Sequence, residues 1–253
     1  MPGTMRGWLL IKKKRTMHKL IFILAVALMA LKPEISKSET IYLLPGQGGD
    51  YRLFQNICIP DHETKVILLE TPHKGEGLPD YARRLSVQID TTESFSLVGV
   101  SFGGMIAVEM AKFLDPEKVI IIASAKSTDE LPFRYKVVKN LRMYKLFNGK
   151  LLKKMANIAR PIAEPDSRED HDIFSAMIND LDPDYLERAI ECVFTWENTE
   201  YRDDIIHLHG TDDRTIPLRN VANPIVVENG SHMMVLTEGD RVGALINEYL
   251  AEN

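Results

Sequence analysis

The stretch "SFSLVGVSFGGMIAVEMAKFL" (residues 94–114) changes character at its centre. It opens as a short apolar run that predicts a buried strand, and it ends with the apolar periodicity of an amphipathic helix. Ser101 stands at the junction, with Gly99 two residues before it and Gly103 two residues after it. Only small neighbours leave room for a sharp strand-to-helix turn that presents a serine hydroxyl above a sheet edge. The stretch therefore predicts a strand–turn–helix unit with Ser101 as a candidate nucleophile.

On either side of this unit, short apolar runs alternate with helix-like segments from residue 40 onward. The almost continuously apolar run "KVIIIASA" (118–125) is typical of a strand that is covered on both faces. Strand–helix alternation predicts an α/β fold with an open, mostly parallel sheet and helices on both faces. The expected strands are 40–45, 65–70, 94–100, 118–125, 204–209 and 224–228, and the helices flanking them are 51–57, 78–89, 103–114 and 240–252.

The alternation stops between about residues 127 and 203, where only helical patterns occur. The expected helices there are 133–147, 149–160, 168–181 and 183–197. We interpret this block as a helical cap insertion at one end of the sheet. A chain of 253 residues suits one such domain, which we place at 39–253 after a separate segment, 1–38.

A serine hydroxyl needs a base within hydrogen-bond reach before it can act as a nucleophile. In sheets of this kind, the loops at the carboxyl ends of the strands form the ligand site. His232 follows the last predicted strand in the loop "NGSHMM" (229–234), which makes it the candidate base. Asp212 and Asp213 follow the preceding strand, and either could supply the acid that orients the base.

His207 and His209 lie two residues apart on a predicted strand and therefore face the same side. With the two acids that follow them they raise the alternative of a metal site. However, H-x-H followed by D-D matches no compact hydrolytic-metal pattern, so we expect no metal and no cofactor.

Cys58 and Cys192 are too few for a disulfide framework; we expect buried, unreactive thiols, or one bridge if the protein is exported.

Four motifs follow one another in the order "LLPGQGGD" (43–50), "LVGVSFGGMIAVEMA" (97–111), "IIHLHGTDDRTIP" (205–217) and "GSHMM" (230–234). Over residues 40–253 this order resembles the α/β-hydrolase fold superfamily, in particular small bacterial serine hydrolases with a helical cap. The resemblance implies that Ser101 is the nucleophile and His232 the general base. Through the pattern H-G-x-x-D-x-x-x-P, it implies Asp213 rather than Asp212 as the acid.

The resemblance also implies an oxyanion hole made by the backbone N–H groups of Gln47 and Phe102. Pro45–Gly46 stands where many relatives carry His-Gly, which keeps the backbone donor but removes a side chain from the loop. The chain begins at what would be the third strand of the full fold, so the predicted sheet is trimmed unless the segment before residue 40 supplies a strand.

The implied reaction is acyl transfer through an acyl-enzyme, with a small carboxylic ester or thioester as substrate. An acyltransferase would use the same residues with an alcohol or amine in place of water. A non-catalytic binding protein of the same fold is the third alternative, and the presence of serine, acid, base and both oxyanion loops speaks against it.

The N-terminal segment has the pattern of a secretory signal. Residues 1–18 carry five Lys or Arg and no acid, and the apolar run "LIFILAVALMAL" (20–31) follows. This run is shorter than the roughly 20 residues that span a bilayer, but its length and basic flank are typical of a signal peptide. We predict export to the periplasm or the exterior, or anchoring by this segment; a different translation start would leave the protein in the cytoplasm.

The net charge of −5 gives no reason to expect nucleic-acid binding. Residues 127–160 nevertheless contain nine Lys or Arg against two acids, interleaved with apolar side chains. Solvated faces of amphipathic helices would explain this pattern. The sharper hypothesis is that the basic block attracts anionic substrates or contacts a lipid surface, as the N-terminal segment could also do. The acyl group and the oligomeric state cannot be read from the sequence.

Overall fold

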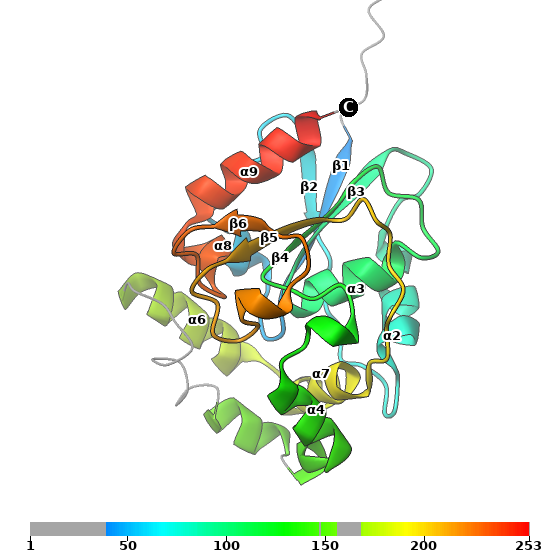
Figure 1. Cartoon of the computed structure of the whole chain (residues 1–253), viewed down its shortest axis with the longest axis vertical. Coiled ribbons are helices and arrows are strands. Elements are labelled where there is room, and N and C mark those ends of the chain that lie inside the picture. Colours follow the sequence, from blue (N-terminus) through cyan, green and yellow to red (C-terminus); the bar gives the residue numbers. More distant parts are fainter. Residues whose placement is uncertain (1–38, 147, 156–167, 253) are drawn as a thin grey trace, which may run out of the picture. The chain divides into compact units, whose positions relative to one another are not determined.

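A computed structural model of the chain describes residues 39–146, 148–155 and 168–252 (Figure 1). The predicted signal segment lies outside these residues, so export and anchoring remain predictions. Within the described ranges, no helix combines the length and the hydrophobicity that crossing a membrane requires.

Six parallel strands form one sheet in the order β2–β1–β3–β4–β5–β6 (Figure 1). The observed parallel sheet confirms the predicted α/β fold class. Because all strands run the same way, their carboxyl ends meet at one edge, where the predicted motif loops lie together. The strands are β1 (Thr40–Leu44), β2 (Glu63–Val66), β3 (Phe95–Val100), β4 (Val119–Ile122), β5 (Ile206–Gly210) and β6 (Ile225–Val227).

Side chains of the central strands alternate between two apolar cores, one on each face of the sheet. On β3, for example, Leu97 packs into one core while Val98 and Val100 pack into the other. Helices α2 (Leu78–Leu85) and α3 (Phe102–Met110) cover the first face, and α8 (Met234–Thr237) and α9 (Gly239–Ala251) cover the second (Figure 1). Coverage on both faces explains why every residue of β3 and β4 is buried and why both strands read as continuous apolar runs.

The short helical turns between these elements are 3-10 helices: η1 (Tyr51–Phe54), η2 (Ser86–Gln88), η3 (Thr128–Glu130) and η5 (Leu218–Asn220). The helices predicted at 78–89, 103–114 and 240–252 correspond to α2 with η2, to α3 and to α9, with ends shifted by a few residues. The helix predicted at 51–57 is only the turn η1.

The strand predicted at residues 65–70 is wrong in position. β2 runs from Glu63 to Val66, lies at the edge of the described sheet beside β1, and exposes all four of its side chains. The apolar run that suggested the strand belongs to the segment that leaves the sheet: Ile67 turns into the core, and Leu68 is exposed. Hydrophobicity marks strands that are covered on both faces, so it points to the wrong residues at a sheet edge.

Between β4 and β5 the described residues form helices and no strand, as predicted for this part of the chain. The helix predicted at 133–147 is shorter than expected, because it divides into α4 and the turn η4. Part of the helix predicted at 149–160 lies outside the described residues. The elements are α4 (Phe133–Asn140), η4 (Met143–Leu146), a helical stretch at 149–155, α6 (Arg168–Asp180) and α7 (Pro183–Thr195).

Both cysteines of the chain are free. Cys192 is buried on α7, where its Sγ lies 3.2 Å from the carbonyl oxygen of Glu76, and burial raises the pKa of its thiol to about 12. Cys58 is exposed, so the expectation of a buried thiol is wrong there. Its place in the loop after η1, outside either core, explains the difference.

Candidate active site

The turn between β3 and α3 holds Ser101 in an unusual backbone conformation, with φ 51° and ψ −117°. Conformations of this kind cost about 1–3 kcal/mol and persist only where neighbours fix them. Here the Ser101 N–H donates to the carbonyl of Ile122 at 2.9 Å, and the Ser124 hydroxyl donates to the carbonyl of Ser101 at 2.7 Å. Both partners come from the β4 side of the sheet, so the adjacent strand holds the turn closed.

Close backbone contacts explain why glycines flank Ser101. A Cβ atom on Gly99 would lie 2.5 Å from the carbonyl oxygen of Gly103, and one on Gly103 would lie 2.1 Å from that of Leu44. Both distances are far below van der Waals contact with rigid backbone. The close approach of α3 to the strands therefore requires glycine at both positions.

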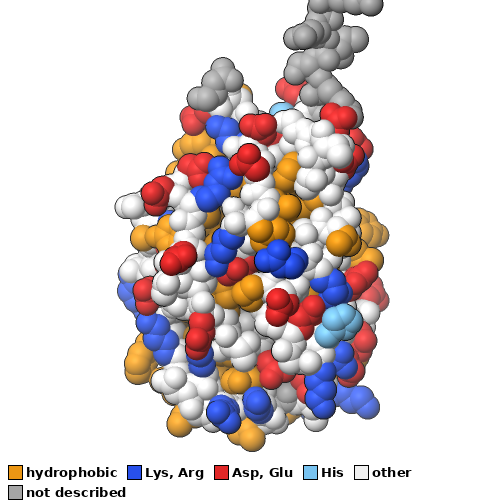
Figure 2. Space-filling model, turned by 90° about the vertical axis from the view of Figure 1, so that its right-hand side faces the viewer, with side chains coloured by type: hydrophobic (Ala, Val, Ile, Leu, Met, Phe, Trp, Pro, Cys, Tyr) orange, Lys and Arg blue, Asp and Glu red, His pale blue; other side chains and the backbone are white. Residues whose placement is uncertain are grey.

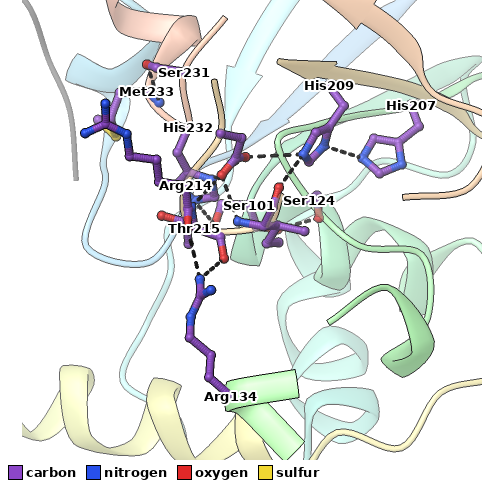
Figure 3. A network of polar contacts seen from close by, with 12 residues as sticks. Ser101, Ser124, Arg134, His207, His209, Arg214, Thr215, Ser231, His232 and Met233 are labelled. Atoms are coloured by element: carbon purple, nitrogen blue, oxygen red, sulfur yellow. Dashed lines mark hydrogen bonds and ion pairs between the residues drawn. The ribbon is translucent and has the colours of Figure 1, made fainter. Parts of the chain in front are cut away.

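The structure brings Ser101 and His232 together at the carboxyl edge of the sheet (Figure 3). Asp213 faces the other ring nitrogen of His232. His232 Nε2 lies 2.9 Å from the Ser101 Oγ, and its Nδ1 lies 2.8 Å from the Asp213 Oδ2. A carboxylate only accepts hydrogen bonds, so Nδ1 carries the proton and Nε2 is free to accept from the serine hydroxyl. This is the tautomer that general-base chemistry at Ser101 requires.

Asp213 is a buried carboxylate that accepts hydrogen bonds on both oxygens. Its Oδ1 accepts from the backbone N–H groups of Thr215 at 2.8 Å and Ile216 at 2.7 Å, and its Oδ2 faces His232. Burial alone would raise the pKa of Asp213, but attraction to His232 and these hydrogen bonds lower it below its ordinary value of 3.8. Its neighbour Asp212 is exposed, which agrees with the choice of Asp213.

His207 and His209 form a second layer behind the acid, on the same side of β5 as expected (Figure 3). The Nε2 of His209 lies 2.7 Å from the Ile216 carbonyl and 3.4 Å from the Asp213 Oδ2, and its Nδ1 lies 3.1 Å from the His207 Nε2. Burial lowers the pKa of both imidazoles, which favours neutral rings. These histidines support the Asp213 loop, and among the described residues no group of three His, Cys, Asp or Glu could hold a metal ion.

The two residues predicted to supply the oxyanion donors, Gln47 and Phe102, line the same cavity as Ser101. Phe102 is the first residue of α3, so its N–H has no acceptor within the helix. Gln47 follows Gly46 in a turn closed by the Gly49 N–H and the Gly46 carbonyl, 2.9 Å apart, with Gly48 at φ 85°. A Cβ on Gly46 would lie 3.3 Å from the Ser101 Cβ, so this turn passes directly against the serine.

A cavity of 180 Å³ opens beside Ser101. Its lining residues, none of them charged, are Gln47, Ser101, Phe102, Met105, Tyr135, Ile190, Val193, Phe194, Thr215 and Ile216. Helices α4 and α7 thus contribute walls to the cavity. The Gln47 side-chain Nε2 is buried and has no hydrogen-bond partner within the described structure.

Three contributors to this site escape sequence reasoning. Ser124 donates a hydrogen bond to the Ser101 carbonyl. The sequence signal for this contact is that Ser124 follows β4, the strand next to β3. Arg134 on α4 donates to the backbone carbonyls of Arg214 and Thr215, so it ties the helical block to the Asp213 loop (Figure 3). Nothing in the sequence marks this contact, nor the position of Tyr135 in the cavity wall.

The sequence model of the Alpha/beta hydrolase family matches residues 28–245, most of the chain. The chain belongs to the alpha/beta hydrolase family. This confirms the resemblance that the four motifs carry, and it identifies the protein as a hydrolase. No curated protein is similar enough in sequence to match this hydrolase.

Solved structures of the same fold include several esterases. A thermophilic esterase from Thermogutta terrifontis shares 14% identity with this hydrolase at a TM-score of 0.61, over 85% of this chain and 90% of that one. An esterase from Exiguobacterium antarcticum shares 16% identity at a TM-score of 0.61, over 86% and 94%. MenH from S. aureus shares 15% identity at a TM-score of 0.60, over 86% and 95%. At these identities the similarity shows the fold alone.

Proposed function

We propose that this hydrolase cleaves carboxylic esters through an acyl-enzyme, with Ser101 as nucleophile, His232 as general base and Asp213 as the acid that orients it. The observation that carries the proposal is the continuous hydrogen-bonded chain from the Ser101 Oγ through both nitrogens of His232 to Asp213. A structural serine would not need a base at 2.9 Å whose tautomer is fixed by a buried carboxylate. The positive φ at Ser101 also fits a residue held for chemistry rather than for stability.

In the first step, His232 removes the proton from the Ser101 hydroxyl while Oγ attacks the ester carbonyl. The backbone N–H groups of Gln47 and Phe102 would stabilise the oxyanion, and the loss of one such donor typically costs about 10²–10³ in rate. Protonated His232 then donates its proton to the leaving alcohol. In the second step, water gives a proton to His232 and attacks the acyl-enzyme, which releases the acid and restores Ser101.

A p-nitrophenyl butyrate assay tests this proposal. The wild type should release p-nitrophenol, with a burst of about one equivalent if deacylation is slow. Ser101→Ala should reduce turnover by several orders of magnitude while it remains folded by circular dichroism. Turnover that persists in Ser101→Ala, or a folded wild type that turns over no ester in the assay, would contradict the proposal.

The same chain of residues would serve thioester cleavage or acyl transfer to another acceptor. Both alternatives share the acyl-enzyme and differ in the bond cleaved or in the acceptor. Adding an alcohol or amine to the burst assay separates hydrolysis from acyl transfer. Hydrolysis gives the free acid throughout, whereas an acyltransferase gives mainly the new ester or amide. Parallel assays with butyryl ester and butyryl thioester compare the two leaving groups.

We also propose that the segment formed by residues 133–146 and 148–155 contacts an anionic lipid surface. This segment contains eight Lys or Arg and no acid. It also exposes large apolar side chains, including Phe133 at 77%, Leu141 at 67% and Leu146 at 74% exposure. In Figure 2, hydrophobic and basic side chains lie together at the lower end of the molecule, where α4 lies in Figure 1. Apolar side chains among basic ones are the composition of interfacial segments, and each basic residue near such a surface contributes about 1 kcal/mol.

Vesicle co-sedimentation tests the lipid contact. The wild type should bind vesicles of phosphatidylglycerol and phosphatidylcholine more strongly than vesicles of phosphatidylcholine alone. Lys150→Glu with Lys154→Glu, both at exposed sites, should reduce the difference. Lys65→Glu with Lys74→Glu, two exposed lysines outside the segment, should leave it unchanged. Equal binding to both vesicle types, or no difference between the two double variants, would refute the contact.

A further inference from the structure

Two cavities meet at one wall within the helical block. The cavity beside Ser101 has a volume of 180 Å³, and a second cavity has a volume of 320 Å³. Tyr135, Val193 and Phe194 line both, so they form the partition between them. The second cavity is lined on its far side by Thr128, Leu131, Lys136, Lys139, Asn140, Trp196 and Glu197.

The volume of the first cavity limits what can sit beside Ser101. An apolar cavity of about 150 Å³ holds one benzene molecule, so 180 Å³ corresponds to roughly seven heavy atoms. The lining carries no charged side chain, and burying an unpaired charge there would be costly. The site is therefore matched to a short, neutral acyl group rather than to a long or anionic one.

The wall between the cavities is made of packed aromatic rings. Phe194 on α7 packs against Tyr135 on α4 with ring centroids 5.3 Å apart, and against Tyr144 in η4 at 5.5 Å with an interplanar angle of 12°. The contacts of Arg134 with the carbonyls of Arg214 and Thr215 tie α4 to the Asp213 loop. Phe194 is thus held by rings from two elements, α4 and η4, and it lines both cavities.

We propose that this hydrolase takes neutral acyl groups of about four to six carbons and that Phe194, with Tyr135, sets the upper limit of acyl length. The proposal rests on the ester-hydrolase function proposed above. One methylene too many in a hydrophobic pocket costs roughly tenfold or more in specificity, so activity should fall steeply beyond the limit. Shortening Phe194 should open the partition and let longer chains enter the second cavity.

A panel of p-nitrophenyl esters from two to twelve carbons tests the limit. The wild type should show its highest kcat/KM between four and six carbons and at least a roughly tenfold loss by ten carbons. Phe194→Ala should move the maximum to eight carbons or more. Phe194→Leu, a milder change, should move it in the same direction and guards against a loss of folding in the alanine variant.

Ile190→Ala provides the matched control, because Ile190 lines only the first cavity. It should enlarge that cavity by a few atoms without reaching the second, so the maximum should shift by fewer carbons than in Phe194→Ala. The proposal is overturned if the wild type already prefers ten carbons or more, or if both Phe194 variants keep the wild-type chain-length profile. Failure of the underlying function would look different: the wild type and Ser101→Ala would be equally inactive on every ester.

Discussion

Replacing Asp213 by asparagine should abolish most activity while leaving the fold intact. The two oxygens of Asp213 have different partners: Oδ1 accepts two backbone N–H groups, and Oδ2 accepts from His232. An asparagine can keep its oxygen at only one of these positions. Placing the NH₂ group at the Oδ1 position would leave the backbone N–H groups of Thr215 and Ile216 without their acceptor, and such a loss costs about 1–3 kcal/mol for a buried group. The amide oxygen should therefore stay with the backbone, and the NH₂ group should face His232.

This orientation of the introduced asparagine amide would reverse the tautomer of the His232 imidazole. Facing a donor, His232 Nδ1 must accept, so the proton moves to Nε2 and the ring can no longer accept from Ser101. The equivalent wrong tautomer in a serine protease lowers kcat by about 10⁴, and we expect a loss of about 10³–10⁴ here. Asp213→Ala should add a stability loss of about 2–6 kcal/mol, because both backbone donors then lack their acceptor.

Initial rates with p-nitrophenyl butyrate and urea unfolding measure the two effects separately. Asp212→Asn is the matched control, since Asp212 is exposed and adjacent in sequence; its rate should stay within about twofold of wild type, as for most surface changes. Asp213→Asn with a rate within tenfold of wild type would show that Asp213 does not set the tautomer of His232. An Asp213→Ala variant as stable as Asp213→Asn would show that the two backbone donors do not depend on the Asp213 side chain.

Further predictions concern stability and the thiols. Because the folded pKa of Asp213 is depressed, its carboxylate contributes stability that is complete above its ordinary pKa of 3.8 and is lost as the pH falls through the folded value. The difference in unfolding free energy between wild type and Asp213→Asn should therefore shrink in urea titrations below about pH 4, and a difference that grew would contradict it. Ser101→Gly should be more stable than Ser101→Ala by about 1 kcal/mol in thermal unfolding, because glycine relieves the positive φ; equal Tm values would argue against strain at the turn. Gly103→Ala should lower the Tm far more than Gly77→Ala, where the added Cβ would sit 3.7 Å from its nearest neighbour; similar losses would mean that α3 can shift. Ellman's reagent at pH 8 should titrate Cys58 rapidly and Cys192 only after denaturation, and two fast thiols in the native protein would show that α7 opens readily.

The sequence predicts the centre of this fold well because its strands are covered on both faces. The apolar runs of β3 and β4 mark such strands directly, and the glycines that flank Ser101 mark the close approach of α3. At the sheet edge, apolar runs do not mark the strand, because all side chains of β2 are exposed; the predicted position of β2 is therefore wrong.

The order of strands along the chain predicts which residues meet at the site, but it does not predict which helices line it. Ser101, Asp213 and His232 follow predicted strands, and parallel strands bring their ends together. The contact of Arg134 with the Asp213 loop and the packing of Phe194 against Tyr144 depend on how helices pack over the sheet edge, which no local pattern encodes. Both are tertiary contacts of the helical block.

Covalent labelling by a fluorophosphonate probe tests whether Ser101 is a nucleophile activated by His232. One adduct per chain is expected by intact mass, located on the peptide that contains Ser101. Labelling should be much slower in His232→Gln and absent in Ser101→Ala. An unlabelled, folded wild type, or an adduct on another residue that persists in Ser101→Ala, would show that Ser101 is not the activated nucleophile.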